Sequence, residues 1–210
     1  MLDTRKEYQI RSIKCSVKIP KQILLTTVTN KLLLFDATIK TYPNFIVFSK
    51  IRDDDNLLPP QFNHNTKYTL FKYSEKPGAK SDVDMHCNIA GLLSLKHIDP
   101  ALKLLAKVID LDVDKLKCKI DNLTSTVKLN PINKSEFMKA NKNIFQQFER
   151  FPSLFLKATS GAVILVYSSG SCVISGCKTI DEIDNSYSYL KECFVNYQNM
   201  IKMAQINITS

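Results

Sequence analysis

Three short stretches in the second half of the chain decide the predicted fold. They are Phe151-Pro-Ser-Leu-Phe-Leu-Lys157, Val163-Ile-Leu-Val-Tyr-Ser-Ser-Gly170 and Val173-Ile-Ser-Gly-Cys-Lys178. Each predicts a β-strand, because apolar and β-branched residues dominate it and Pro or Gly bounds it. Ser168-Ser-Gly-Ser171 predicts a hairpin turn, since it lacks the glycine density and the following helix of a phosphate-binding loop.

The strand predicted at 162–168 carries apolar side chains on both of its faces. Side chains alternate across a strand, so Ile164 and Val166 point one way while Val163, Leu165 and Tyr167 point the other. An antiparallel sheet covered by helices on one face is normally polar on the other. Two interpretations stay open on this pattern: a sandwich with both faces buried, or an open apolar face that awaits a partner surface.

Four features flanking these stretches occur twice along the chain, in the same order. Each half has an opening strand, an aromatic-proline pair before an apolar run, a strand pair and a closing amphipathic helix. In the first half these features lie at 8–17, 42–48, 67–73 with 84–91, and 99–110. In the second half they lie at 117–127, 151–157, 162–168 with 171–177, and 179–203.

A further helix is expected in each half, at about 20–37 and at about 131–149, the second with Ser135 as its N-cap. Each half then predicts the order β-α-β-β-β-α, with room for one more short strand. Strands grouped in this way predict an α+β fold, in which helices cover one face of an antiparallel sheet. The expected repeats are 1–110 and 111–210.

The composition favours a polyanionic partner. The 210 residues carry a net charge of +9, which suits nucleic acid or an acidic membrane surface. No run of 18 or more apolar residues and no signal-peptide core is present, so we expect no membrane association. The six cysteines form no CxxC pair and no zinc spacing, which predicts reduced thiols and neither metal nor cofactor.

Signals for catalysis are weak. Asp53, Asp54 and Asp55 are consecutive loop acids, whose side chains point in different directions. Asp82, Asp84 and His86 alternate on one predicted strand face, a second weak candidate for a metal site. We expect no enzymatic activity.

The three quoted stretches resemble the second repeat of the TATA-box-binding protein (TBP) family. The family pattern is Phe-Pro-Gly-Leu-Ile-Tyr-Arg, then a strand ending in Phe before a Ser-Gly turn, then Val-Leu-Thr-Gly-Ala-Lys. Lys119-Ile-Asp-Asn-Leu-Thr124 likewise resembles the family's Lys-Ile-Gln-Asn-Ile-Val. The resemblance is specific over about 115–195 and faint over 8–110, as in a divergent member of viral or protist origin.

This resemblance implies a pseudo-two-fold saddle, whose curved antiparallel sheet carries helices on its convex face. It also implies a transcription initiation factor that binds A/T-rich promoter DNA in the minor groove and bends it with wedged rings. General initiation factors and the RNA polymerase machinery are then the expected protein partners. The expected location is the nucleus or, for a viral protein, the viral factory or virion.

The resemblance also assigns roles in the second half. Phe151 and Tyr167 occupy the positions of two kinking rings, and Asn122 that of an Asn that donates to groove acceptors. Lys157 stands at a phosphate-contacting Arg, and Lys178 at the Lys that ends Gly-Ala-Lys. Further groove-facing positions hold Thr124, Val163, Leu165, Val173 and Ser175.

The first half departs from the family pattern. Ser12 stands at the central Asn and Lys14 at an apolar position, while Tyr42 replaces the first kinking Phe. The second ring falls on Phe71, with a strand register uncertain by one residue, and the groove-facing set ends with His86 and Asn88. A lysine and a histidine on this face weaken the case for tight, shape-selective binding by this half.

Two alternatives follow from this divergence. The chain is either a TBP-fold interaction module of a transcription complex that has lost DNA binding, or a single-stranded nucleic-acid binder that stacks bases on sheet aromatics. Rings at the two ends of the saddle favour duplex kinking, whereas rings in the middle of the sheet favour stacking of single strands.

Overall fold

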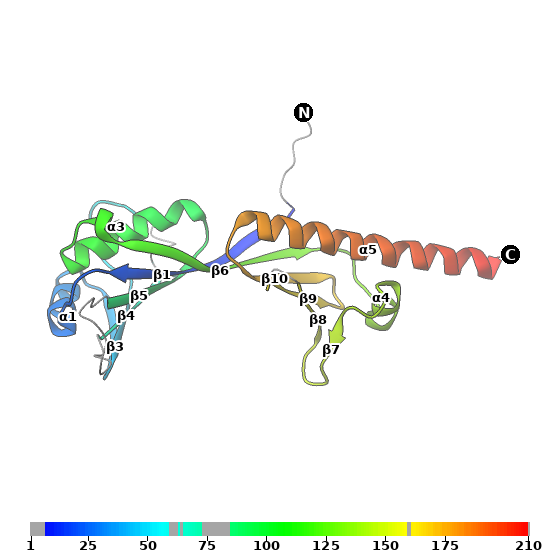
Figure 1. Ribbon diagram of the computed structural model, residues 1–210, viewed down its shortest axis with the longest axis horizontal. Coiled ribbons are helices and arrows are strands. Elements are labelled where there is room, and N and C mark those ends of the chain that lie inside the picture. Colours follow the sequence, from blue (N-terminus) through cyan, green and yellow to red (C-terminus); the bar gives the residue numbers. More distant parts are fainter. Residues whose placement is uncertain (1–6, 59–62, 64, 73–84, 159–160, 210) are drawn as a thin grey trace, which may run out of the picture. The chain divides into compact units, whose positions relative to one another are not determined.

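The computed structural model describes residues 7–58, 63, 65–72, 85–158 and 161–209 (Figure 1). The predicted candidates Asp82 and Asp84 lie outside the described residues. The chain forms two compact units. One unit is Ser12–Asp121, and the other joins the chain up to Arg11 with the chain from Asn122 onward.

Ten strands form one sheet in the described part of the chain. The first half contributes β1 (Gln9–Ile19), β2 (Thr38–Tyr42), β3 (Phe45–Ser49), β4 (Lys67–Phe71) and β5 (Met85–Leu92). The second half contributes β6 (Lys117–Lys128), β7 (Gln146–Gln147), β8 (Ser153–Lys157), β9 (Val163–Tyr167) and β10 (Ser171–Cys177).

The two halves share one strand order. From β1 outward the neighbours are β5, β4, β3 and β2, and from β6 outward they are β10, β9, β8 and β7. All of these pairs are antiparallel. The repeated order confirms the predicted α+β fold with an internal repeat, and both predicted strand pairs are present. The repeat boundary at 110 and the saddle curvature stay predictions.

The described helices are α1 (Leu25–Leu34), α3 (Ile98–Ile109), α4 (Lys134–Ala140) and α5 (Ile180–Thr209), with short 3-10 turns at Leu95–His97 and Val113–Lys115. None of them is both long and apolar enough to cross a membrane. Both closing helices lie where the sequence predicts them, α3 near 99–110 and α5 near 179–203.

The two inner helices are shorter than predicted. The range 20–37 was too long, because α1 begins only at Leu25 and ends at Leu34, before Asp36, whose φ is 49°. The range 131–149 was wrong because α4 ends before Lys142 and Asn143, which have φ values of 53° and 56°. In both halves the residues after the helix enter a short strand instead, β2 or β7.

The N-cap of α4 is Asn133 rather than the predicted Ser135. Asn133 Oδ1 accepts hydrogen bonds from the backbone N–H groups of Ser135 and Glu136, at 3.0 and 3.3 Å. An Asn side chain before the first helical turn satisfies donors that the helix leaves unpaired. Ser135 therefore lies inside the first turn.

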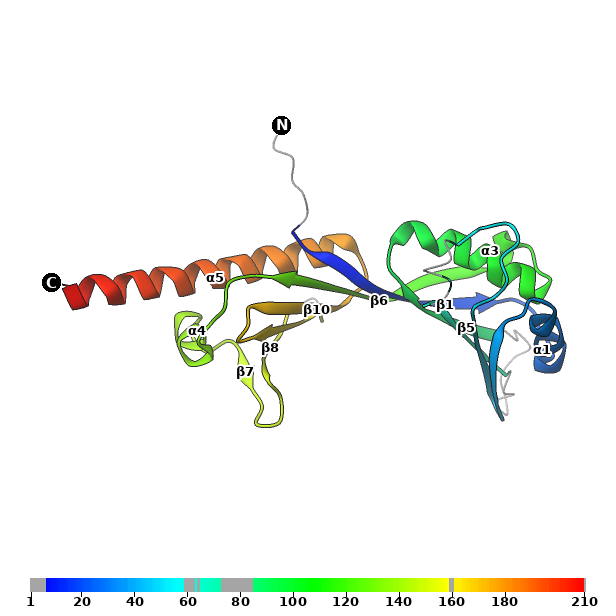
Figure 2. The ribbon, with the colours of Figure 1, turned by 180° about the vertical axis from the view of Figure 1, so that it is seen from behind.

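The core of each unit lies between its closing helix and one face of its sheet (Figures 1 and 2). In the first unit, α3 buries Leu104, Leu105 and Val108, and the buried Tyr68 hydroxyl donates to Ala101 O at 3.3 Å. In the second unit, α5 packs on β10 and buries Ile183 and Leu190. Phe137 also meets the rings of Phe145, Phe194 and Tyr197 edge to face, which joins α4 to α5.

A glycine marks the same point in each half. Gly91 in β5 has φ 90° and Gly176 in β10 has φ 87°, a region that disfavours residues with a Cβ. The strand register shifts beside each of them. A Cβ at Gly91 would lie 2.2 Å from the backbone O of Asn65, whereas at Gly176 the nearest atom is Gly161 O at 3.2 Å. These bulges fix equivalent positions in the two halves.

Candidate nucleic-acid interface

The open sheet face of the second unit, opposite its helices, has an apolar central row. Register places Phe155 beside Leu165, Leu165 beside Val173, and Val173 beside Thr126. All four side chains are half-buried, whereas their neighbours Leu154, Ile164, Val166, Cys172 and Ile174 are buried beneath the helices. The apolar second face predicted for 162–168 is therefore open to solvent and not the inside of a sandwich.

Two further rows flank this central row. In one, Lys157 lies beside Val163 and Val163 beside Ser175, whose hydroxyl is 2.9 Å from that of Thr124. In the other, Ser153 lies beside Tyr167. The second-half residues predicted to face a groove, Asn122, Thr124, Val163, Leu165, Tyr167, Val173 and Ser175, thus share one face.

Asn122 is held by the bulge of β10. Its Oδ1 accepts hydrogen bonds from the backbone N–H of Gly176 at 2.6 Å and from Ser175 Oγ at 3.4 Å, and its Nδ2 donates to Thr124 Oγ1 at 3.2 Å. The amide nitrogen uses one N–H for Thr124 and keeps the other for a further acceptor. This orientation suits an Asn that donates a hydrogen bond.

Aromatic side chains gather at the turn between β7 and β8. Phe151 is 64% exposed and Phe148 is 48% exposed, with ring centroids 6.3 Å apart. Phe148 also meets Phe155, at 5.7 Å. The sequence analysis identified Phe151 but missed Phe148 and Phe155. Phe155 could have been found, because it has the same strand parity as Lys157.

The two predicted lysines of the second half lie at the ends of strands. Lys157, the last residue of β8, is exposed beside Val163. Lys178 is exposed just after β10, and its backbone N–H donates to Glu182 Oε2 at 2.6 Å. Glu182 N in turn donates to Thr179 Oγ1 at 3.2 Å, so the start of α5 fixes this segment.

The open face of the first unit has the same rows with mostly polar side chains. One row runs from Lys40 through Val47, Thr69 and Asn88 to Ser16. The next row runs from Ser49 through Lys67 and Ala90 to Lys14. Ser12 is half-buried near the end of this face, and Ser16 Oγ donates to Asp121 Oδ1 at 3.0 Å.

Three aromatic side chains also gather at the end of the open face in the first unit. Tyr42 stacks on Phe45 at 4.4 Å, and Phe45 meets Phe71 at 5.7 Å. Phe71 is half-buried while its neighbour Leu70 is buried, so Phe71 belongs to the open face and the register uncertainty is resolved. His86 lies on this face beside Lys18. The sequence analysis missed Phe45, Lys40 and Lys67.

Registers set by the two bulges make the halves comparable position by position. Gly91 corresponds to Gly176, so Asn88 corresponds to Val173 and Ala90 to Ser175. Through their cross-strand neighbours, Lys67 then corresponds to Val163 and Thr69 to Leu165. Along the central strands, Ser16 corresponds to Thr126, which sets Lys14 against Thr124 and Ser12 against Asn122.

Groups that could have supported catalysis are engaged elsewhere. Asp53 accepts a hydrogen bond from Leu58 N at 2.7 Å, Asp54 pairs with Arg52 at 3.1 Å and Asp55 pairs with Lys107 at 2.7 Å. The described residues contain no group of three or more potential metal ligands. The thiols are free, and burial raises the pKa of Cys172 to about 12.

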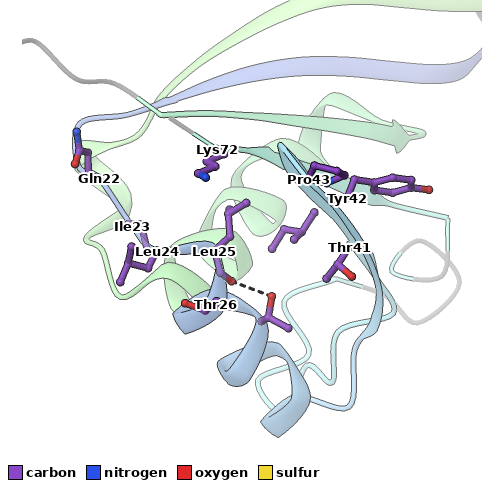
Figure 3. A pocket seen from close by; sticks show the side chains of 11 residues that line it. Gln22, Ile23, Leu24, Leu25, Thr26, Thr41, Tyr42, Pro43 and Lys72 are labelled. Atoms are coloured by element: carbon purple, nitrogen blue, oxygen red, sulfur yellow. Dashed lines mark hydrogen bonds between the residues drawn. The ribbon is translucent and has the colours of Figure 1, made fainter. Parts of the chain in front are cut away.

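A hollow of about 610 Å³ lies in the first unit, between the start of α1 and the β2–β3 hairpin (Figure 3). Leu24, Leu25 and Ile46 line it, and Thr29 Oγ1 donates to Leu25 O at 2.8 Å in the first turn of α1. Tyr42 extends its ring away from the hollow, as Figure 3 shows. This hollow is therefore separate from the rows on the sheet.

Comparison with known proteins finds the same fold in a solved structure and a family match over part of the chain. The solved structure of Methanococcus jannaschii TBP superposes with a TM-score of 0.60 at 20% identity, over 92% of this chain and 99% of that chain. This superposition and the repeated strand order of the sheet define a protein of the TBP fold class. Residues 117–197 match the family described as transcription factor TFIID, or TATA-binding protein. The chain therefore has the TBP fold and is similar to this family over residues 117–197, and no curated protein sequence matches it.

The family comprises transcription factors rather than enzymes, in keeping with the expected absence of catalysis. The match over 117–197 carries the family's description as a transcription factor, and the solved structure shares the fold. The match begins at the first residue of β6, so it covers the half in which the apolar row lies and leaves out the half with the polar rows.

Proposed function

We propose that the protein binds A/T-rich double-stranded DNA through the minor groove and bends it. The observation that carries this proposal is the open apolar row of Phe155, Leu165 and Val173. The minor groove offers few distinguishing polar groups, so a surface with few hydrogen-bonding groups can press against it. Such a surface also excludes the guanine amino group, which favours A·T pairs over G·C pairs.

The positions of the aromatic rings support bending. Tyr42, Phe71 and Tyr167 are the last residues of their strands, and Phe151 lies just before β8. Rings at strand ends can enter a base step while the sheet contacts the groove between them. Rings in the middle of the rows would instead favour stacking of single-stranded bases, and those positions hold Leu165, Val173, Thr69 and Asn88.

The finer role follows from the family. We propose that the protein acts in transcription initiation, on promoter DNA, and that general initiation factors and the RNA polymerase machinery join it there. The nucleus, or a viral factory or virion for a viral protein, is the proposed site of action.

The test is an electrophoretic mobility shift with two duplexes of equal length, one A·T-rich and one G·C-rich, at 50 and 200 mM salt. The proposal expects tighter binding to the A·T-rich duplex and weaker binding at the higher salt concentration. End-labelled duplexes should also show a shorter end-to-end distance by energy transfer when the protein binds. Equal binding to both duplexes without bending would contradict the proposal.

The variant Leu165→Lys tests whether the apolar row makes the contact. It places a charge in the middle of the apolar row and leaves the helix-facing core intact. It should lose binding while retaining the thermal stability of the parent protein. If the parent protein binds neither duplex, the TBP-fold interaction module becomes the better interpretation.

A further inference from the structure

A hollow of about 440 Å³ lies on the open face of the second unit, at the end of the apolar row. Three strands line it, each with alternate side chains that project to one side. They are Gln9 and Arg11 from β1, Thr126 and Lys128 from β6, and Ser171 and Val173 from β10. Because Val173 also belongs to the apolar row, the hollow continues the proposed DNA surface.

Two cations line this hollow and are held by the sheet. Arg11 Nε donates to Thr126 Oγ1 at 3.0 Å, which fixes one edge of the guanidinium group. Lys128 Nζ donates to Ser169 O at 2.6 Å and to Ser171 Oγ at 3.2 Å. In the described part of the chain, no carboxylate pairs with either cation.

The acidic side chain of the hollow is paired with groups outside the two cations. Glu7 lines the rim, where its carboxylate accepts a hydrogen bond from the Tyr187 hydroxyl and pairs with Lys191 Nζ at 3.6 Å. The Tyr187 hydrogen bond and the Lys191 charge lower the pKa of Glu7, so it stays ionised at neutral pH. The hollow therefore presents a guanidinium group, an ammonium group and a hydroxyl group as donors around an open volume.

We propose that Arg11 and Lys128 bind one phosphodiester group of the DNA backbone, which sets the position of a strand along the edge of the apolar row. This assignment rests on the proposed function. A guanidinium group fixed through Nε keeps its terminal N–H groups for two phosphate oxygens, while the ammonium adds a point charge. The sequence analysis assigned phosphate contacts to Lys157 and Lys178 and did not include this pair.

The first test measures the salt dependence of duplex binding. A plot of log affinity against log salt has a negative slope. The variant Arg11→Gln/Lys128→Gln should make this slope shallower by about 0.9, the value for one neutralised phosphate. Lys202→Gln, which removes an exposed charge from α5, should leave the slope unchanged. Thr126→Val should weaken binding and keep the slope, because the charge remains while the guanidinium loses its anchor. A double variant with the parental slope would overturn the proposal.

The second test does not require duplex binding. The Nε–H signal of Arg11 in ¹⁵N-NMR spectra should shift when inorganic phosphate is added, and should shift further with a short A·T-rich duplex. Glu7→Gln should strengthen the phosphate response, because it removes a negative charge from the rim. A response to phosphate without duplex binding would support the anion site and reject the proposed function. An Arg11 signal that responds to neither ligand would reject the anion site.

Discussion

The open faces of the two halves share a backbone register and differ in their side chains. Where the second half has Val173, Leu165 and Val163, the first half has Asn88, Thr69 and Lys67. The faces beneath the helices are alike: the positions of Cys172 and Ile174 hold Cys87 and Ile89 in the first half, all buried. The fold is therefore specified by the buried face, and the open face is free to diverge without loss of the sheet.

This difference separates two ways of holding DNA. An apolar row can exclude water from a groove, and its contribution grows with the area that it buries. A lysine on the same surface stays hydrated or meets a phosphate, because a buried unpaired charge is costly. We therefore expect the second half to set sequence preference and bending, and the first half to contribute salt-dependent affinity.

The largest expected effect concerns the ring of Phe151, in the turn between β7 and β8. Phe151→Ala should weaken binding to an A·T-rich duplex by roughly 3 kcal/mol, about 100-fold, because it removes the wedge that holds an unstacked step open. Tyr42→Ala should cost less, since Tyr42 already stacks on Phe45 at 4.4 Å. Affinity and bend angle for both variants on one duplex provide the measurement. A larger loss for Tyr42→Ala would reverse the assignment of the two halves.

The two bulges should respond unequally to a methyl group. Gly91→Ala should lower the free energy of unfolding by about 3 kcal/mol, because positive φ and the backbone of Asn65 both oppose a Cβ. Gly176→Ala should cost about 1 kcal/mol, since its nearest contact is 3.2 Å away. Chemical denaturation of both variants checks the order, and equal losses would show that φ alone decides.

Exchanging residues between the two faces tests the comparison directly. Leu165→Thr/Val173→Asn gives the second half the central residues of the first. It should weaken DNA binding by about 2 kcal/mol, or about 30-fold, because less apolar surface is buried against the groove. The reverse exchange, Thr69→Leu/Asn88→Val, should strengthen binding and sharpen the preference for A·T pairs. Titration of each variant with the two duplexes gives both quantities, and no change in either variant would leave the apolar row without a role in binding.

The lysines of the first face should appear in the salt dependence. Lys14→Thr/Lys67→Val carries the second-half residues at these positions, and should lower the slope by about 0.9 for each phosphate that a lysine neutralises in the parent complex. Lys103→Gln, which removes an exposed charge from α3, serves as the control. If the exchange and the control give the same slope, these lysines are hydrated in the complex and do not contact phosphate.

The smallest effect concerns thiol chemistry, in which Cys118 differs from the buried cysteines. Cys118 is half-buried, and a hydrogen bond from the Cys15 thiol lowers its pKa. In the second unit, burial raises the pKa of Cys172 to about 12 and that of Cys193 to about 11. A thiol reagent at pH 8 should therefore modify Cys118 first in the folded protein. Peptide mapping identifies the site, and first modification at Cys193 would contradict the assignment.

The sequence predicted the fold well where patterns are local and strong. Strand pairs with apolar alternation and both closing amphipathic helices lie close to their predicted ranges. The inner helices were overestimated, since Asp36 follows α1 and Lys142 and Asn143 follow α4 with positive φ, a backbone conformation that a helix does not contain. Asn133 was missed as an N-cap because Ser135, two residues later, offers a similar oxygen.

The sequence predicted only those residues of the candidate site that match the family pattern. Resemblance to a family locates positions where the residues match, so it identified Asn122, Phe151 and Leu165. It gave no indication of Arg11 or Lys128, because their association depends on the pairing of β1 with β6 over more than a hundred residues of chain. Lys40 was missed since the expected first half had no strand at β2, whereas Phe45 lay in an expected apolar run and shares its strand parity with Val47.

The bulge at Gly176 has a consequence for how mutations act on this surface. Side chains alternate along β10 from Ser171 to Ile174, and the bulge then adds one residue before Cys177. Deletion of Val173 would therefore place Cys172 and Ile174 on opposite faces of the strand. One of these two side chains would then be lost from the core, although no amino-acid type in the strand had been replaced. A single-codon deletion here should therefore be far less tolerated than most substitutions at Ser175, whose side chain lies on the open face.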